Sequence, residues 1–146
     1  MDVQSPAGFG IRLIANLLDG IMLFVVLGFV SLIVYGHFYT NSISVVDILN
    51  ILYYVLLPVI WYGYTVGKRA VGIRIARVDG EKISLGTMLL REVVGGIVYA
   101  FTLGIGLIIS AFMVGLREDK RSIHDLIAGT YVTYEPPMED ERVGER

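Results

Sequence analysis

Three long apolar runs divide the chain, at residues 11–34, 45–64 and 93–116. Each reaches the length of roughly 20 residues that an α-helix needs to cross the hydrocarbon core of a bilayer. The second run ends in Trp61, Tyr62 and Tyr64, and such aromatic side chains favour the membrane interface. The first run lacks the basic start and the cleavage site of a secretory signal, so we expect it to be retained. The pattern therefore predicts membrane helices.

The third run, with its lead-in from residue 84, allows two arrangements. As one helix, residues 84–116 would be ~50 Å long, which is more than one span needs. Residues 102–106 (TLGIG) offer a break, and a helical hairpin there would return the chain to its starting side. Gly96, Ala100 and Gly104 lie four residues apart and instead suit the close packing of one continuous helix. A single span after a surface helix that carries Arg91 and Glu92 also fits the pattern.

Two short segments are typical of β-strands. Residues 71–78 have a strand-like pattern and end at Asp79-Gly80, a pair that favours a hairpin turn. Residues 131–134 are also β-prone and stop before Pro136. Neither segment is stable alone, and pairing them requires both on one side of the membrane. This requirement favours the hairpin arrangement of the third run.

Basic residues indicate which side that is. The loop at residues 35–44 contains no Lys or Arg, whereas residues 65–86 contain several. The positive-inside rule therefore predicts that residues 65–86 and the N-terminus are cytoplasmic, and the hairpin would make the C-terminus cytoplasmic as well. We expect a basic cytoplasmic patch beside anionic lipid headgroups, made of Lys68, Arg69, Arg74 and Arg77.

The composition agrees with a membrane protein. Of 146 residues, 55% are hydrophobic and only 18% are charged, against about 25% charged in a soluble domain. We predict an all-α integral membrane domain over residues 1–135, with three to four membrane segments and a small cytoplasmic β element. Residues 136–146 read as a disordered charged tail.

Several function classes are excluded. The net charge of −2 rules out a nucleic-acid binder that relies on bulk positive charge. There is no cysteine, and His37 lies far from His124, so we expect no disulfide, no metal site and no cofactor. His124-Asp125 resembles half a metal site, but a capping or tethering role fits it better. No nucleophile–base pair with supporting groups is visible, so we do not expect an enzyme.

The first apolar run carries charges that a bilayer disfavours. Arg12, Asn16 and Asp19 fall within about 40° of one another on a helix and form one polar stripe. Such charges must face protein or water. A direct ion pair between Arg12 and Asp19 is not expected, because both side chains lean toward the N-terminus from positions two turns apart. Glu92 and Asp125 are candidate partners for Arg12.

Taken together, these segments resemble the RDD family of small membrane proteins, named for one arginine and two aspartates. The resemblance covers residues 7–133 and rests on AGFGIR at 7–12, LDG at 18–20, TVGKRAVGIR at 65–74, SLG at 84–86, LRE at 90–92 and RSIHDLIAGT at 121–130. It assigns the family's arginine to Arg12 and its two aspartates to Asp19 and Asp125. Most of the family has no assigned function, although transport of an unidentified ligand and cation/proton exchange are suggested for some members.

Two hypotheses follow. The first is a secondary transporter in the bacterial cell (inner) membrane that exchanges monovalent cations for protons as a homo-oligomer. In that case Asp19 is the ion- or proton-binding carboxylate, because burial raises a carboxyl pKa toward neutrality. The alternative is a non-transporting membrane scaffold or assembly factor, bound to itself or to another membrane protein. In that case Arg12, Asn16, Asp19 and Asp125 form a structural polar set.

Overall fold

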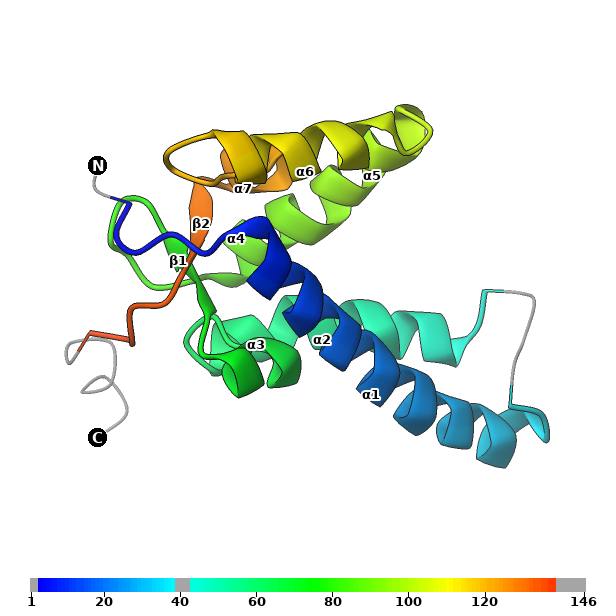
Figure 1. Ribbon diagram of the computed structural model, residues 1–146. Coiled ribbons are helices and arrows are strands. Elements are labelled where there is room, and N and C mark those ends of the chain that lie inside the picture. Colours follow the sequence, from blue (N-terminus) through cyan, green and yellow to red (C-terminus); the bar gives the residue numbers. More distant parts are fainter. Residues whose placement is uncertain (1–2, 39–42, 139–146) are drawn as a thin grey trace.

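The computed structural model describes residues 3–38 and 43–138. The fold is mostly helical, with one small antiparallel sheet (Figure 1). The helices are α1 (Phe9–Tyr35), α2 (Val45–Ile60), α3 (Val66–Val71), α4 (Leu85–Leu89), the π-helical turn η1 (Leu90–Val94), α5 (Gly95–Phe101), α6 (Ile105–Leu116) and α7 (Ile123–Ala128), and the strands are β1 (Arg74–Arg77) and β2 (Thr130–Thr133). Residues 139–146, most of the predicted tail, lie outside the described residues.

Helix α1 matches the first predicted membrane helix. Its outer face is apolar and open, with Ile21 and Phe24 each 65% exposed and Ile33 83% exposed. The helix ends at Gly36, which takes the left-handed conformation with φ 75°. Among the helices of residues 3–38 and 43–138, α1 alone has the length and apolar composition to cross a bilayer by itself. So much exposed apolar surface is expected only where lipid or another protein covers it.

Helix α2 is shorter than the second apolar run predicts. It ends at Ile60, and Tyr62 has a φ of 54°, which a helix cannot continue. At 16 residues, the helix is ~24 Å long, against ~30 Å for the hydrocarbon core. The chain then turns back at Gly63, where a Cβ would lie 1.9 Å from the carbonyl oxygen of Ile75. The close approach of these two backbone segments therefore requires glycine.

The third apolar run breaks where the sequence offers a break. The helices on either side, Leu85–Phe101 and Ile105–Leu116, are bent by 119°. Leu103 and Gly104 both have positive φ, at 54° and 83°. The chain therefore returns on itself as a helical pair. Its first half is not a uniform α-helix, because η1 inserts a wider π-helical turn between α4 and α5.

The two predicted strands pair with each other. β1 and β2 are antiparallel, with Arg74 opposite Thr133 and Arg77 opposite Thr130. The N-terminal segment lies along β2, since the backbone N–H of Ala7 donates to the carbonyl of Val132 at 2.8 Å. The predicted pairing is confirmed, but the hairpin at Asp79-Gly80 is wrong because the chain continues from there into α4. The first strand is also shorter than residues 71–78, since α3 ends at Val71 and Gly72 is left-handed.

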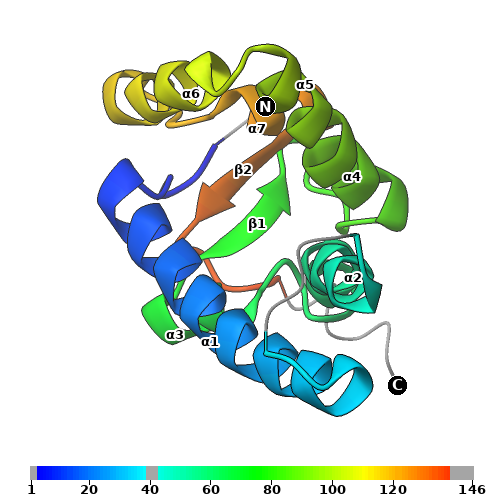
Figure 2. The same ribbon diagram turned by 90° about the vertical axis from the view of Figure 1, so that its right-hand side faces the viewer.

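A sheet of two strands is marginal by itself. Here the helices stabilise it, and Figure 2 shows both strands in the middle of the molecule with helices around them. The core buries apolar residues from strands, helices and the segments that connect them: Ala7, Ala15, Val55, Ile73, Ile75, Met88 and Val132.

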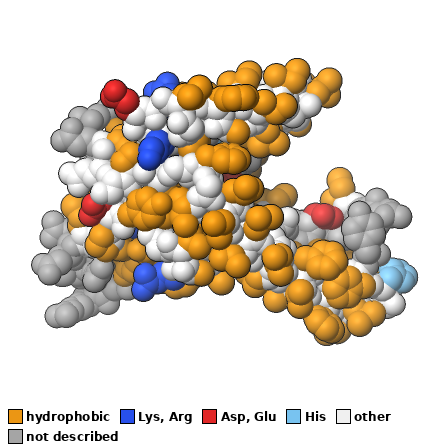
Figure 3. Space-filling model, in the orientation of Figure 1, with side chains coloured by type: hydrophobic (Ala, Val, Ile, Leu, Met, Phe, Trp, Pro, Cys, Tyr) orange, Lys and Arg blue, Asp and Glu red, His pale blue; other side chains and the backbone are white. Residues whose placement is uncertain are grey.

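The long helices leave this sheet-centred end as two arms. α1 and α2 form one arm and α5 and α6 the other, with the sheet and α3 where the arms meet (Figure 1). The space-filling view shows hydrophobic side chains over both arms, while Lys and Arg gather near the end that holds the sheet (Figure 3). The polar residues of the candidate site therefore lie between an apolar region and a charged one.

Candidate functional site

Asp125 lies at the centre of a buried ionic cluster. One carboxylate oxygen accepts a hydrogen bond from Nη1 of Arg12 at 2.7 Å, and the other is bound by Nη1 of Arg91. The same Arg91 nitrogen donates to Oγ1 of Thr130 at 2.8 Å. Asp125 has no exposed surface, and both arginines are less than one-tenth exposed. These residues, with Ser122, are called the Asp125 cluster below.

Local sequence places Asp125 for this role. Ser122 and Asp125 form a capping box at the start of α7, in which the Ser122 hydroxyl and backbone N–H both bind Oδ2 of Asp125. Arg12, in the first turns of α1, also donates to the carbonyls of Ala7 at 3.0 Å and Lys120 at 2.5 Å. The cluster thus joins α1, η1 and the C-terminal segment. Its contacts connect parts of the chain more than 100 residues apart.

The charges in the Asp125 cluster do not cancel. Burial alone would raise the pKa of Asp125, but the charges of Arg91 and Arg12 outweigh it and hold the pKa far below its usual range. Asp125 is therefore ionised at neutral pH. One carboxylate faces two guanidinium groups, so the cluster carries one excess positive charge.

Asp19 forms a second buried cluster, two turns along α1. Its carboxylate accepts hydrogen bonds from the hydroxyls of Tyr53 and Thr65, both at 2.6 Å, and from the backbone N–H of Gly67 at 2.8 Å. Asp19 is completely buried. These four residues are called the Asp19 cluster below. They tie α1 to α2 and to the first turn of α3.

The approach of α3 to α1 is unusually close at this point. A Cβ on Gly67 would lie 2.1 Å from the carbonyl oxygen of Ala15, so only glycine fits there. Thr65 begins α3 by accepting a hydrogen bond from the backbone N–H of Lys68, while its own hydroxyl proton goes to Asp19. One threonine therefore caps a helix and binds the carboxylate at the same time.

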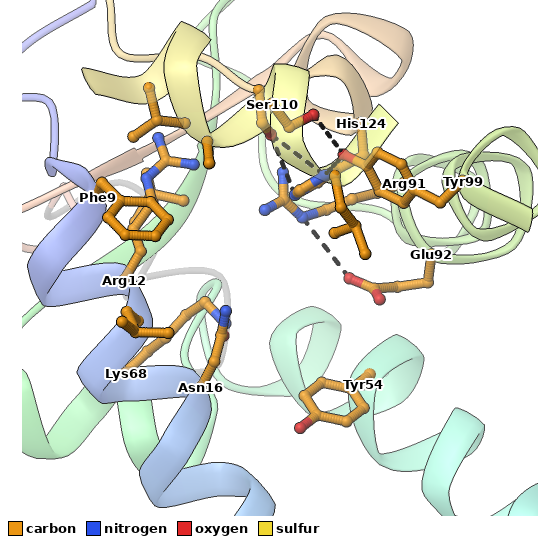
Figure 4. A pocket seen from close by; sticks show the side chains of 16 residues that line it. Phe9, Arg12, Asn16, Tyr54, Lys68, Arg91, Glu92, Tyr99, Ser110 and His124 are labelled. Atoms are coloured by element: carbon orange, nitrogen blue, oxygen red, sulfur yellow. Dashed lines mark hydrogen bonds and ion pairs between the residues drawn. The ribbon is translucent and has the colours of Figure 1, made fainter. Parts of the chain in front are cut away.

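A pocket of about 380 Å³ lies between the two arms. Figure 4 shows Arg12, Asn16 and Lys68 on one side, Arg91, Glu92 and Tyr99 on the other, and Tyr54 below them. The remaining wall is mainly apolar and comes largely from α1 and α6: Phe9, Leu13, Leu107, Ala111 and Val114. It is called the central pocket below.

Two cationic side chains at the central pocket have nitrogen atoms without hydrogen-bond partners in the described part of the chain. Lys68 is 7% exposed, and its ammonium makes no hydrogen bond or ion pair with the residues that the structure describes. Burial first, and then the charge of Arg91, lower the pKa of Lys68 to about 8. Nε of Arg91 is buried without a hydrogen bond, and lies 3.6 Å from a carboxylate oxygen of Glu92.

His124 belongs to a neutral network on the wall of the pocket. Its Nδ1 lies 2.5 Å from the hydroxyl of Tyr99, which in turn lies 2.8 Å from the hydroxyl of Ser110. Burial first, and then the charge of Arg91, lower the pKa of His124 to about 3, so the imidazole is uncharged at neutral pH. No group of three acidic, histidine or cysteine side chains within residues 3–38 and 43–138 could hold a metal ion.

The residues of the predicted polar stripe do not act as one group. Arg12 contacts Asp125 and Asp19 contacts α2 and α3, so the two charges of α1 belong to different clusters. Asn16 lies between them, exposed, at the edge of the central pocket. It makes no side-chain hydrogen bond to the described part of the chain, so it does not bridge Arg12 and Asp19.

The four residues of the predicted basic patch do not form one exposed surface. Lys68 and Arg74 are buried, at 7% and 5% exposure, whereas Arg69 is exposed. Lys68 faces the central pocket, and Arg74 donates to the carbonyls of Tyr62 and Glu135. Arg77 pairs with Asp79 on the surface. The four side chains are separated because α3 ends at Val71 and the chain then enters the sheet.

The sequence also misplaces Arg91. It predicts a surface position beside Glu92, whereas Arg91 is buried in the Asp125 cluster. One signal for its burial was available in the sequence. Arg91 comes almost directly before an uncharged apolar run, and an arginine on the protein-facing side of such a helix needs a buried partner. The π-helical turn that carries it has no local sequence signature, and such turns recur at functional sites.

Comparisons with known proteins show which family the chain resembles. The model of the RDD family matches residues 6–129. Uncharacterized protein YckC of Bacillus subtilis strain 168 is 49% identical over 97% of this chain and 93% of its own length. Uncharacterized membrane protein YteJ of the same organism is 32% identical over 90% of this chain and 83% of its own length. No solved structure matches the chain significantly.

The exposed apolar helices and the buried Asp125 and Asp19 clusters define a small helical membrane protein. This chain belongs to the RDD family of such proteins. Arg12, Asp19 and Asp125 are the residues that the resemblance assigned to the family's name, and all three are buried in the two clusters.

Proposed function

We propose that this protein is a non-transporting membrane scaffold whose Arg/Asp set is structural. The Asp125 and Asp19 clusters hold the two helical arms and the sheet in one rigid frame. The exposed faces of that frame then bind another membrane protein or a second copy of this chain. No step of this function requires an ion to pass through the protein.

The observation that carries this proposal is the environment of Asp19. A carboxylate that exchanges protons and cations needs an open coordination site and a path to water. Asp19 is instead fully buried, accepts three hydrogen bonds, and does not line the central pocket. We therefore favour the scaffold over a cation/proton antiporter.

We further propose that the sheet-bearing end faces the cytoplasm. β1 and β2 pair, and the N-terminal segment lies along β2, so these three parts share one side of the membrane. The connection on this side of the membrane, residues 65–86, carries Lys68, Arg69 and Lys82. The positive-inside rule therefore favours the cytoplasm for it. In this arrangement α1 and α2 cross the bilayer, and the bent pair enters it and returns.

A partner helix has a place to bind. A groove of about 370 Å³ lies between α2 and α5, and Asn50, Ile51, Gly96 and Ala100 help to line it. A Cβ on Gly96 would meet no atom of the described chain within 4 Å. Small residues on an open membrane-helix face allow close backbone approach of a second helix. This supports self-association or binding of another membrane protein.

Ion flux in proteoliposomes tests the proposal. Wild-type protein and Asp19→Asn are reconstituted under an imposed pH gradient, and sodium, lithium and potassium are added in turn. We expect no cation-dependent collapse of the gradient with either protein, while an ionophore added last collapses it and shows that the vesicles are tight. Flux through wild type that disappears in a folded Asp19→Asn would instead establish transport with Asp19 on the ion path.

A further inference from the structure

The central pocket concentrates positive charge around an open space. Arg12, Lys68 and Arg91 all line it, and Glu92 is the one carboxylate among the residues that do so. Asp125, behind the wall, balances one of the two arginines. With all these side chains in their usual ionisation states, the pocket keeps one excess positive charge. A buried charge without a counter-ion is costly, so an anion in this space would stabilise it.

Lys68 is the strongest reason to expect such an anion. Its ammonium is more than nine-tenths buried, reaches the pocket, and has no hydrogen-bond or ion-pair partner among residues 3–38 and 43–138. An ammonium group has three donors to satisfy. Asp19 does not fill this role, because its carboxylate already accepts hydrogen bonds from Tyr53, Thr65 and Gly67. Glu92 lines the same pocket but is paired with Arg91.

Arg91 supplies a second cationic group on the facing wall. Nη1 of Arg91 is bound by the Asp125 cluster, and Nε is buried without a hydrogen bond, 3.6 Å from a carboxylate oxygen of Glu92. Arg91 and Lys68 come from different elements, η1 and α3, and both line the same space (Figure 4). A tetrahedral oxyanion can accept from an ammonium and a guanidinium together, and arginine and lysine are the side chains that bind phosphate in proteins.

The apolar wall of the pocket indicates that the anion belongs to a lipid. Its apolar wall is formed by Phe9 and Leu13 of α1 with Leu107 and Val114 of α6. Leu13 and Leu107 are also exposed on the outer surface, at 45% and 57%, so this wall continues into the lipid-facing side of both arms. A headgroup in the pocket could leave its acyl chain along that wall. Basic pockets between membrane helices bind anionic lipid headgroups in this way.

We propose that the central pocket binds a phosphate group, held by Lys68 and Arg91, and that in the membrane this phosphate belongs to an anionic phospholipid. Glu92 stands at the edge of the site and opposes the anion, so it sets the affinity. Tyr54 lines the same pocket and lies below Arg91 and Glu92. This inference does not depend on the scaffold function, because a protein that transports ions and one that does not could both bind a lipid.

Lipid titration of the purified full-length protein tests the site. Protein stripped of lipid in a neutral maltoside detergent is titrated with dihexanoyl phosphatidic acid, and binding is followed by calorimetry. Dihexanoyl phosphatidylcholine is the zwitterionic comparison, and inorganic phosphate is the free anion. We expect phosphatidic acid to bind most tightly, phosphatidylcholine weakly, and inorganic phosphate to compete. Stronger binding of inorganic phosphate than of phosphatidic acid would keep the phosphate site and overturn the lipid as its source.

Variants separate the site from general charge effects. Lys68→Gln is expected to weaken binding about tenfold or more, the scale of one lost charge-assisted hydrogen bond. Lys82→Gln removes the same charge from an exposed loop position and should leave affinity unchanged. Glu92→Gln removes the opposing charge and should strengthen binding severalfold, which misfolding cannot imitate.

Folding is checked in the same samples. Lys68→Gln removes a buried ammonium that has no partner, so its unfolding temperature should equal or exceed that of wild type. Equal affinities of wild type, Lys68→Gln and Glu92→Gln for phosphatidic acid would overturn the proposal. Equal binding of phosphatidylcholine and phosphatidic acid, without competition by inorganic phosphate, would overturn it as well.

Discussion

Asp125→Ala is expected to lower the free energy of unfolding by about 3–5 kcal/mol, the range for removing one partner of a buried ion pair. Arg12 and Arg91 would both lose their carboxylate while remaining buried. The change also removes the capping box that starts α7 with Ser122. Reversible unfolding in mixed micelles, or the yield of folded protein, measures the loss.

A surface carboxylate provides the control for this result. Asp119 pairs with Arg117 in the exposed connection after α6, where solvent screens the interaction. Asp119→Ala should therefore leave stability almost unchanged. If Asp119→Ala and Asp125→Ala reduced stability equally, burial and the two arginines would have no special role, and the Asp125 cluster would not be a structural clamp.

Asp19→Asn is expected to lower the free energy of unfolding by about 3 kcal/mol, the scale of one or two hydrogen bonds to a charged acceptor. An amide keeps one acceptor oxygen but turns N–H donors toward groups that are donors themselves. The backbone N–H of Gly67 and the hydroxyls of Tyr53 and Thr65 all now donate to the carboxylate. The measurement is the unfolding free energy in the same mixed micelles.

Asn16 is the matched control on the same helix. It belongs to the polar stripe of α1 with Asp19, but it is exposed at the edge of the central pocket. Asn16→Ala should change stability little, because no hydrogen bond to the described chain is lost. Equal and small effects of Asn16→Ala and Asp19→Asn would contradict a structural role for Asp19 and favour an ionisable group that the fold does not need.

Local sequence patterns predict those parts of the fold that short-range physics controls. Helix α1 follows from an unbroken apolar run, and the bend before Ile105 follows from Gly104. The strand segments were recognisable from their β-prone residues. Their pairing followed from a physical requirement, since an isolated strand cannot satisfy its backbone. The early end of α2 at Ile60 was missed because the backbone contact of Gly63 with Ile75 involves the sheet, which lies outside the apolar run.

The candidate site was predictable only where charge required a partner. A buried arginine in α1 needs a carboxylate, and Asp125 was one of two candidates in the sequence. The burial of Lys68 was not predictable, because it depends on how close α3 lies to α1 at Gly67 and on where η1 packs. Arg91 was misplaced for the same reason, since the extra width of a π-helical turn changes which face a residue occupies.

A double-mutant cycle between Arg12 and Asp125 tests the structural role of the polar set most directly. Unfolding free energies are measured for wild type, Arg12→Ala, Asp125→Ala and the double variant. If the two residues clamp α1 to the C-terminal segment, the double variant should be more stable than the sum of the single changes predicts, with a coupling of about 2 kcal/mol. Additive losses, within about 0.5 kcal/mol, would contradict the clamp.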